Sequence, residues 1–404
     1  QALLNKVKNY WVKGVLETSL HDQVAIVLGL ELRPEAIVSP WNLAIADAIH
    51  ANHDLPPHTP IISVFDQMGV GRTLLILGEP GSGKTTTLLQ LTRDLLRRTE
   101  QDPGHLIPVV LNLSSWAGHQ ASGKQTPGIS FARWIVAELN SKYQIPKKIG
   151  QPWVEQQQLL LLLDGLDEVP EDYRDVCVAA INEFQRDYGT EMVVCSRIKD
   201  YEALSQRLHV QTAVYLQALT TEQIYHYLDQ FRLDLTGLKT LLQRDHPLRE
   251  LAQSPLLLNM MLLTYQDMAI EEVMQPTLIE ERRQQLFDAY IHRMFQRRSF
   301  RSSQAPYSQG ETIAWLSWLA QQLVNRSQTV FLIEQLQPTW LHGTRQNRIY
   351  LMGVLIVGIL LAMPVAFASG MLTNGWIEGW SAGLFKSAVN CVIFGIVVGL
   401  MFRL

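Results

Sequence analysis

The chain has 404 residues, enough for about two or three domains, and its 34 Lys and Arg against 38 Asp and Glu give a formal net charge of −4. The absence of a basic excess argues against a nucleic-acid partner. Three widely spaced cysteines, Cys177, Cys195 and Cys391, argue against a disulfide framework or a zinc site and favour a reducing compartment. Because the chain begins at Gln1 and ends in an apolar stretch, we expect a fragment of a longer protein.

Residues 1–60 are predicted to form an N-terminal helical and linker region. The first residues are amphipathic, with Leu3, Leu4 and Val7 recurring at helical spacing. A stretch rich in proline and histidine, HANHDLPPHTP, closes the region at Pro60. Its histidines could bind a metal, but the remaining ligands and a rigid spacing are absent, and a solvated linker explains the composition better.

Residues 61–219 are predicted to form an α/β domain. Short apolar runs alternate with helical stretches, and several of the runs are rich in β-branched residues or bounded by polar turns. Continuous apolar strands favour a parallel sheet that is covered on both faces, built from βαβ units. The predicted strands are RTLLIL at 72–77, IPVVLNL at 107–113, LLLLL at 159–163, EMVVCS at 191–196 and TAVYLQAL at 212–219.

Residues 220–345 are predicted to be helical. The segment TTEQIYHYLDQF opens with a threonine N-cap and has Glu222 close behind, which is typical of a helix start. The segment LRELAQSPLLLNMMLLTYQ is helical on both sides of Pro255. We interpret this region as a helical lid, followed by a small domain that could be a winged helix.

The first predicted strand leads into GEPGSGKT, which matches the phosphate-loop pattern G-x-x-x-x-G-K-[ST] in its strand–loop–helix context. The glycines let backbone N–H groups wrap phosphates at a helix N-terminus, whose dipole favours anions. Lys84 would bridge the terminal phosphates and the Thr85 hydroxyl would bind Mg²⁺. The predicted nucleotide-binding residues here are Gly78, Glu79, Pro80, Gly81, Ser82, Gly83, Lys84, Thr85 and Thr86.

A second motif, LLLLLDGLDEV at 159–169, ends a buried strand in three acids. The strand would deliver Asp164 to the carboxyl edge of the sheet, where it would hold Mg²⁺ together with Thr85. Gly165 would let the chain double back, so that Asp167 and Glu168 face the same cleft. One of these two carboxylates would orient the attacking water, with Glu168 the first choice.

The strand EMVVCS is followed by Arg197, at the tip of the neighbouring strand. An arginine there can reach the γ-phosphate and act in catalysis, as charge-stabilising groups do in phosphoryl transfer. The alternative is an ordinary surface arginine.

GEPGSGKT, the doubled acid of LLLLDGLDE and the arginine-tipped strand together resemble the NACHT-type NTPases of the STAND group of signal-transduction ATPases. The resemblance covers about residues 61–260 and is weaker to 345. It implies a P-loop fold with a helical and winged-helix region, ATP or another nucleoside triphosphate with Mg²⁺, and homo-oligomerisation on activation. In such proteins a proline after the sheet contacts the base, and Pro255 in SPLLLNMM resembles that motif; the alternative is a helix-breaking proline.

Residues 346–404 are predicted to be a membrane region with spans at about 349–370 and 384–402. Residues 349–377 carry no charged side chain. This uncharged stretch is longer than the ~20 residues needed to cross a bilayer. Arg345 and Arg348 precede the first span and Arg403 follows the second, so both ends are predicted to face the cytoplasm. The loop between the spans has two tryptophans and neither lysine nor arginine. The alternative is a buried hairpin of a soluble domain.

The sequence therefore predicts a multi-pass membrane protein with its NTPase domain in the cytoplasm. As a function we expect a membrane-tethered switch that binds ATP and Mg²⁺, exchanges between ATP and ADP states and hydrolyses slowly. Two alternatives remain: a transport-coupled ATPase, and a nucleotide-binding scaffold without turnover. The lack of an LSGGQ-like stretch counts against an ABC transporter, and the intact pair Asp167–Glu168 counts against the scaffold.

Overall fold

The structure of the protein is a computed structural model. It describes residues 2–17, 28–37, 55–56, 59–102, 104–116, 131–231, 233–266, 278–299, 307–325, 345, 348–354 and 356–357. The chain divides into two compact units, Gln1–Thr329 and Val330–Leu404. In the second unit the described residues are helical.

Within the described part of the chain, six strands form one sheet in the order β1-β6-β2-β5-β4-β3. The strands are β1 (Leu30–Leu32), β2 (Thr73–Gly78), β3 (Ile107–Asn112), β4 (Leu159–Asp164), β5 (Met192–Arg197) and β6 (Thr212–Leu216). The five from β2 to β6 are mutually parallel, and they confirm the five strands predicted from the apolar runs. β1 pairs antiparallel with β6 and was not predicted. It lies within residues 1–60, so this region also contributes an edge strand to the sheet.

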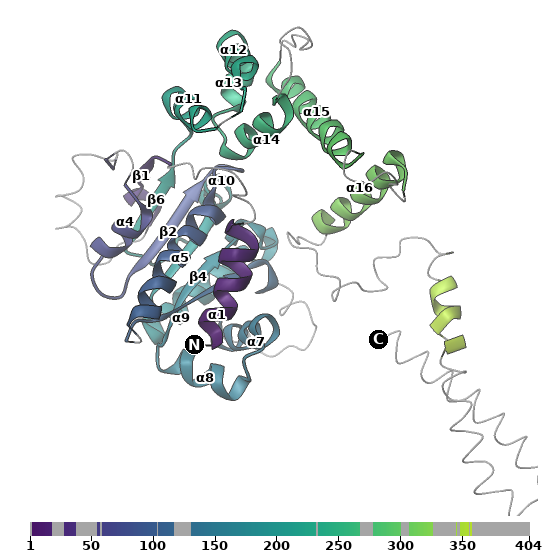
Figure 1. Cartoon of the computed structure of the whole chain (residues 1–404). Helices are drawn as coiled ribbons and strands as arrows, with labels where there is room; N and C mark the ends of the chain where they lie inside the picture. Colours follow the sequence, from purple (N-terminus) through teal and green to yellow (C-terminus); the bar gives the residue numbers. More distant parts are fainter. Residues whose placement is uncertain are drawn as a thin grey trace, which may run out of the picture. The chain divides into compact units, whose positions relative to one another are not determined.

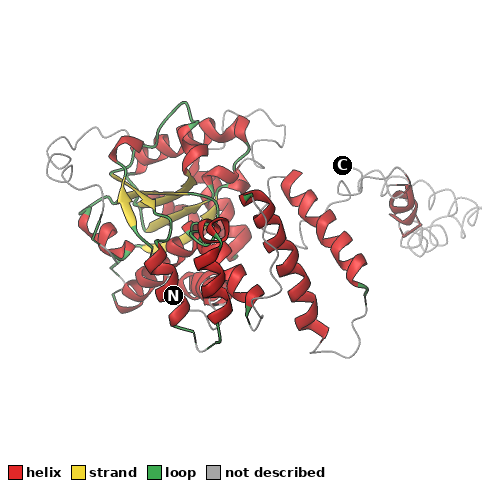
Figure 2. Cartoon of the chain, turned by 90° about the horizontal axis from the view of Figure 1, so that it is seen from above, coloured by secondary structure: helices red, strands yellow, loops and turns green. Residues whose placement is uncertain are grey.

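Helices surround the strands (Figures 1 and 2). Up to β6 the helical elements are α1 (Ala2–Val7), the π-helix η1 (Lys8–Leu16), η2 (Pro34–Ala36), α4 (Ile61–Gln67), α5 (Lys84–Gln101), α7 (Phe131–Tyr143), α8 (Lys147–Glu155), η3 (Leu166–Glu168), α9 (Glu171–Tyr188) and α10 (Ile198–Glu202). After β6 come α11 (Thr221–Asp229), α12 (Thr236–Arg244), α13 (His246–Leu251), α14 (Pro255–Tyr265), α15 (Ile279–Ser299) and α16 (Gln309–Asn325). The described part of residues 220–325 is thus helical, as predicted.

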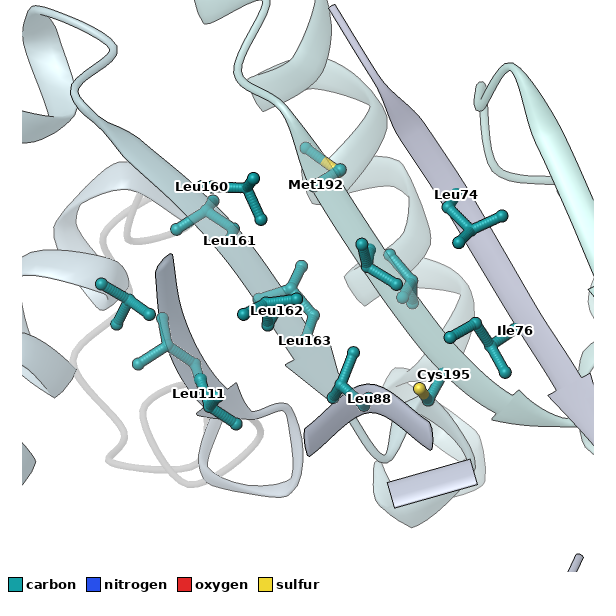
Figure 3. Packing of buried hydrophobic residues seen from close by; sticks show 14 of the residues in the cluster. Leu74, Ile76, Leu88, Leu111, Leu160, Leu161, Leu162, Leu163, Met192 and Cys195 are labelled. Atoms are coloured by element: carbon teal, nitrogen blue, oxygen red, sulfur yellow. The ribbon is translucent and has the colours of Figure 1, made fainter. Parts of the chain in front are cut away.

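The core explains why β4 is a run of leucines. Every residue of β4 is buried, and its leucines pack against β3, β5 and α5, as Figure 3 shows around Leu161 and Leu163. A strand in the interior of a sheet with both faces covered needs apolar side chains at consecutive positions, not at alternate ones. The same core cluster contains Leu3, Trp11 and Leu16 of the N-terminal helices. Trp11 Nε1 donates to the Tyr143 hydroxyl over 2.8 Å.

The helices after β6 have a hydrophobic cluster of their own, built from α11 to α15. Thr220 caps α11 as predicted, but its partner in the capping box is Gln223, at the third helical position, and not Glu222. At Gln223 the side chain can reach back to the Thr220 N–H. The second cluster gives this region a core separate from that of the sheet.

The predicted membrane spans fall mostly outside the described residues. This applies to the whole of 384–402 and to most of 349–370. Among the helices of the described residues, none is both long enough and apolar enough to cross a membrane. The two-span topology therefore stays a prediction.

Candidate functional site

The loop at residues 78–85 joins β2 to α5, and we call it the phosphate loop. Gly81 has φ +74° and Gly83 has φ +93°, in the left-handed region that favours glycine. Gly83 is the N-cap of α5, a helix of 18 residues, so unpaired backbone N–H groups and the positive end of the helix dipole face the loop. This geometry suits an anion, and nucleotide binding by these residues stays a prediction.

Lys84 points back into this loop. Its Nζ donates to the carbonyl oxygens of Gly78 over 2.9 Å and of Glu79 over 3.0 Å. Burial lowers the pKa of Lys84, and attraction to the carboxylates of Asp167 and Asp164 partly opposes the shift. The ammonium group is thus held inside the curve of the loop, where an anion would be bound.

The Thr85 hydroxyl donates to Asp164 Oδ2 over 2.8 Å, so the two predicted metal ligands lie side by side. Asp164 is the last residue of β4 and only 8% exposed; burial raises its pKa, and the bond from Thr85 lowers it in part. A hydroxyl and a carboxylate next to a phosphate loop fit Mg²⁺, which takes oxygen ligands and keeps several waters. The described residues hold no cluster of three or more His, Cys, Asp or Glu suited to a metal.

Asp167 holds Arg197. Asp167 Oδ1 accepts from the Arg197 backbone N–H over 3.1 Å, and Asp167 Oδ2 lies 2.8 Å from Arg197 Nε. The Asp167 side chain is 7% exposed and that of Arg197 is 49% exposed. Both carboxylate oxygens of Asp167 are therefore engaged by the predicted catalytic arginine, which sits at the end of β5 beside the phosphate loop strand β2.

Glu168 has a different partner. Its Oε2 accepts from Asn112 Nδ2 over 2.9 Å, and Asn112 is the last residue of β3, in register with Asp164. Asn112 Oδ1 in turn accepts from the Ser114 N–H over 2.8 Å. Gly165, at φ +76°, turns the chain so that the Glu168 side chain folds over it. Glu168 is therefore held by β3, whereas Asp167 is held by β5. The role of Glu168 toward water stays a prediction.

The start of α14 contacts the phosphate loop. The Gly81 carbonyl oxygen accepts from Ser254 Oγ and from the Leu256 N–H, each over 3.3 Å. A Cβ at Gly81 would lie 2.9 Å from Ser254 Oγ, so the close approach needs glycine there as much as the backbone angle does. Pro255, the first residue of α14, lies between these two contact residues. The structure thus brings the predicted proline to the phosphate loop.

The structure brings the predicted site residues together from β2, β4, β5 and α14. Two residues that matter to the site were missed by sequence reasoning: Asn112 and Ser254. A polar residue at the carboxyl end of β3, beside the strand that ends in Asp164, was a usable signal for Asn112. Ser254 had no such signal, because its contact depends on how α14 docks.

Residues 72–232 match the NACHT domain family. The match supports a NACHT P-loop NTPase. No match is found among curated proteins. Among solved structures, the structure of C. elegans PCH-2 is similar at 12% identity and a TM-score of 0.31, over 66% of this chain and 75% of that one. A likeness this weak carries no argument, so the NACHT match and the site geometry carry the functional inference.

Proposed function

We propose that this chain binds ATP, or another nucleoside triphosphate, with Mg²⁺ at the phosphate loop and hydrolyses it slowly as a membrane-tethered switch. One observation carries the nucleotide-binding part of the proposal: the Thr85 hydroxyl and the Asp164 carboxylate meet at 2.8 Å beside the loop that holds Lys84. The two residues are 79 positions apart in the chain. If the acids after β4 were only a surface turn, this contact with Thr85 would not be expected.

The roles follow from position. Lys84 would neutralise the terminal phosphates, because its ammonium group already lies within the loop. Thr85 and Asp164 would hold Mg²⁺, which neutralises phosphate charge when bound. Glu168 would orient and accept a proton from the attacking water. Arg197 would stabilise charge on the γ-phosphate, with its guanidinium oriented by Asp167.

A switch is favoured by the contact between the phosphate loop and α14. Ser254 and Leu256 both donate to the Gly81 carbonyl oxygen, so a shift of the loop on nucleotide binding would displace the start of α14. α14 belongs to the second hydrophobic cluster, which would move with it. Tethering to the bilayer and homo-oligomerisation on activation rest on the sequence, through the apolar stretches at about 349–370 and 384–402 and through the family resemblance.

The test is ATP binding and turnover by the parent chain and by Lys84→Ala, with and without membranes. We expect Lys84→Ala to weaken ATP binding by at least about 10- to 100-fold, since a hydrogen bond to a charged group contributes about 1.5–3 kcal/mol. The matched control is Lys147→Ala, which removes an exposed lysine on α8 and should leave binding unchanged. Equal ATP affinity of Lys84→Ala and the parent would contradict the proposal, and fast turnover driven by a transported substrate would contradict the switch.

A further inference from the structure

Arg174 lies near the site but belongs neither to the phosphate loop nor to the acidic motif after β4. Arg174 lies near the start of α9, and its side chain is 12% exposed. Its guanidinium donates to three acceptors: Asp167 O over 2.9 Å, Val169 O over 3.2 Å and Asp200 Oδ1 over 3.0 Å. Two of these lie on the turn after β4 and the third lies on α10, directly after β5.

The segments that Arg174 joins lie beyond the hydrogen-bonded ladder of their strands. β4 and β5 pair from Leu161↔Met192 to Leu163↔Val194. After that the chain from β4 turns at Gly165, and the chain from β5 enters α10. Side-chain contacts such as those of Arg174 join the two strand ends to each other beyond that point, at the edge where ligands collect in this kind of sheet.

These contacts form a closed ring that includes Arg197. The Arg174 guanidinium holds the backbone of Asp167, and the Asp167 carboxylate holds the N–H and the Nε of Arg197. Asp200, three residues after Arg197, accepts a hydrogen bond from Arg174 and so completes the ring. Arg197 is thus fixed on one side through Asp167 and on the other through Asp200, and both routes end at the same guanidinium.

Arg197 gains from a further support because its own side chain is half exposed, although that of Asp167 is buried. An ion pair that is open to solvent contributes little and does not by itself keep a long side chain in one place. Arg174 is largely shielded, and its planar group presents several N–H donors in a fixed fork, which suits three acceptors in different directions. Of the two arginines, Arg174 is therefore the more shielded and the more fully bonded.

We propose that Arg174 is a positioning residue that sets the place of Arg197 at the nucleotide site. This inference rests on the proposed hydrolysis of a nucleoside triphosphate. The three acceptors of Arg174 belong neither to the phosphate loop nor to the pair Thr85–Asp164. It acts through Asp167 and Asp200, so its removal should affect the step that needs Arg197 more than it affects nucleotide affinity.

The experiment compares kcat and KM for ATP in Arg174→Ala, Arg174→Lys, Arg197→Ala and the double variant Arg174→Ala/Arg197→Ala. We expect Arg174→Ala to lower kcat about 10- to 100-fold, as a misplaced catalytic group does, with KM changed less than about threefold. Lysine should not rescue, since a compact ammonium cannot span the three acceptors. The matched control is Arg186→Ala on the same helix, whose side chain is 70% exposed and pairs with Glu183 and Asp187; it should match the parent.

Coupling separates positioning from mere structural support. If Arg174 acts through Arg197, the double variant should be no slower than Arg197→Ala alone. Losses that multiply in the double variant, a loss mainly in KM, or an Arg186→Ala effect equal to that of Arg174→Ala would overturn the inference. If Arg174→Ala does not fold, Asp200→Ala removes one arm only and should give a smaller loss of kcat that is likewise absent in the Arg197→Ala background.

Hydrogen exchange distinguishes failure of this inference from failure of the proposed function. The Arg197 amide N–H is bonded to Asp167, so it should exchange faster in Arg174→Ala than in Arg186→Ala without any nucleotide. If the parent hydrolyses no nucleotide, the proposed function fails and exchange alone decides: faster exchange in Arg174→Ala supports the positioning role, and equal rates overturn it.

Discussion

Gly165→Ala should stop hydrolysis while leaving nucleotide binding intact. Gly165 has φ +76°, and a Cβ built there would lie 2.6 Å from Oε2 and 2.7 Å from Cδ of Glu168. At these distances the Glu168 carboxylate must move. We expect the move to break its 2.9 Å bond to Asn112. The nearest atoms that the added Cβ would meet all belong to Glu168 and none to the phosphate loop, which is why binding should persist.

Gly189 provides a reference for the loss of stability and of turnover expected in Gly165→Ala. Gly189 also has a left-handed backbone, with φ +61°, but an added Cβ would meet nothing within 4 Å. Gly189→Ala should therefore cost only the backbone strain, about 1–2 kcal/mol. Gly165→Ala should cost that strain plus the Glu168 hydrogen bond, about 1.5–3 kcal/mol more for a charged acceptor. If Glu168 is the general base, turnover should also fall about 10²–10⁴-fold in Gly165→Ala alone.

The assay is single-turnover ATP hydrolysis together with equilibrium ATP binding and urea denaturation of both variants. We expect both alanine variants to bind ATP as the parent does. Only Gly165→Ala should show the large fall in turnover. Two results would refute the reasoning: parent-like turnover in Gly165→Ala, or equal losses of turnover in the two variants. The first would remove Glu168 from the water-orienting role, and the second would trace the effect to strain.

Three further predictions use other parts of the chain. Asp164→Asn should abolish the Mg²⁺ dependence of ATP binding, whereas Glu168→Gln should retain bound ATP and slow its hydrolysis; similar weakening of binding in both, with no trapped ATP, would contradict the assignment. Thr220→Ala should lower the free energy of unfolding by about 1 kcal/mol through loss of the capping box, measured by denaturation, and a change near zero would show that the cap is not needed. For the two-span topology, a cysteine introduced at Thr373 should react with an impermeant thiol reagent on intact cells, and one at Gln346 only after lysis; the reverse pattern, or labelling at both, would rule out that topology.

The amino-acid sequence by itself determined the five parallel strands and the chemistry of the loop and acidic turn. Each of these signals is local: an apolar run bounded by polar turns, or glycines at fixed offsets from Lys84 and Thr85. Gly165 belongs to the same class, because its left-handed angle is required by the turn in which it sits. β1 escaped prediction since three residues are too few to show a period, and only its pairing with β6 makes it a strand.

Only the tertiary structure decided which side chain holds which. Asp167 and Glu168 are adjacent and chemically alike, yet one pairs with Arg197, 30 positions away, and the other with Asn112, 56 positions away. The bond from Ser254 to Gly81 joins residues 173 apart. Nothing local distinguishes the two carboxylates, because their partners are chosen by how β3, β4 and β5 are ordered in the sheet and by the direction in which the turn at Gly165 releases each side chain. The ring through Arg174 follows from the same ordering of neighbouring strands.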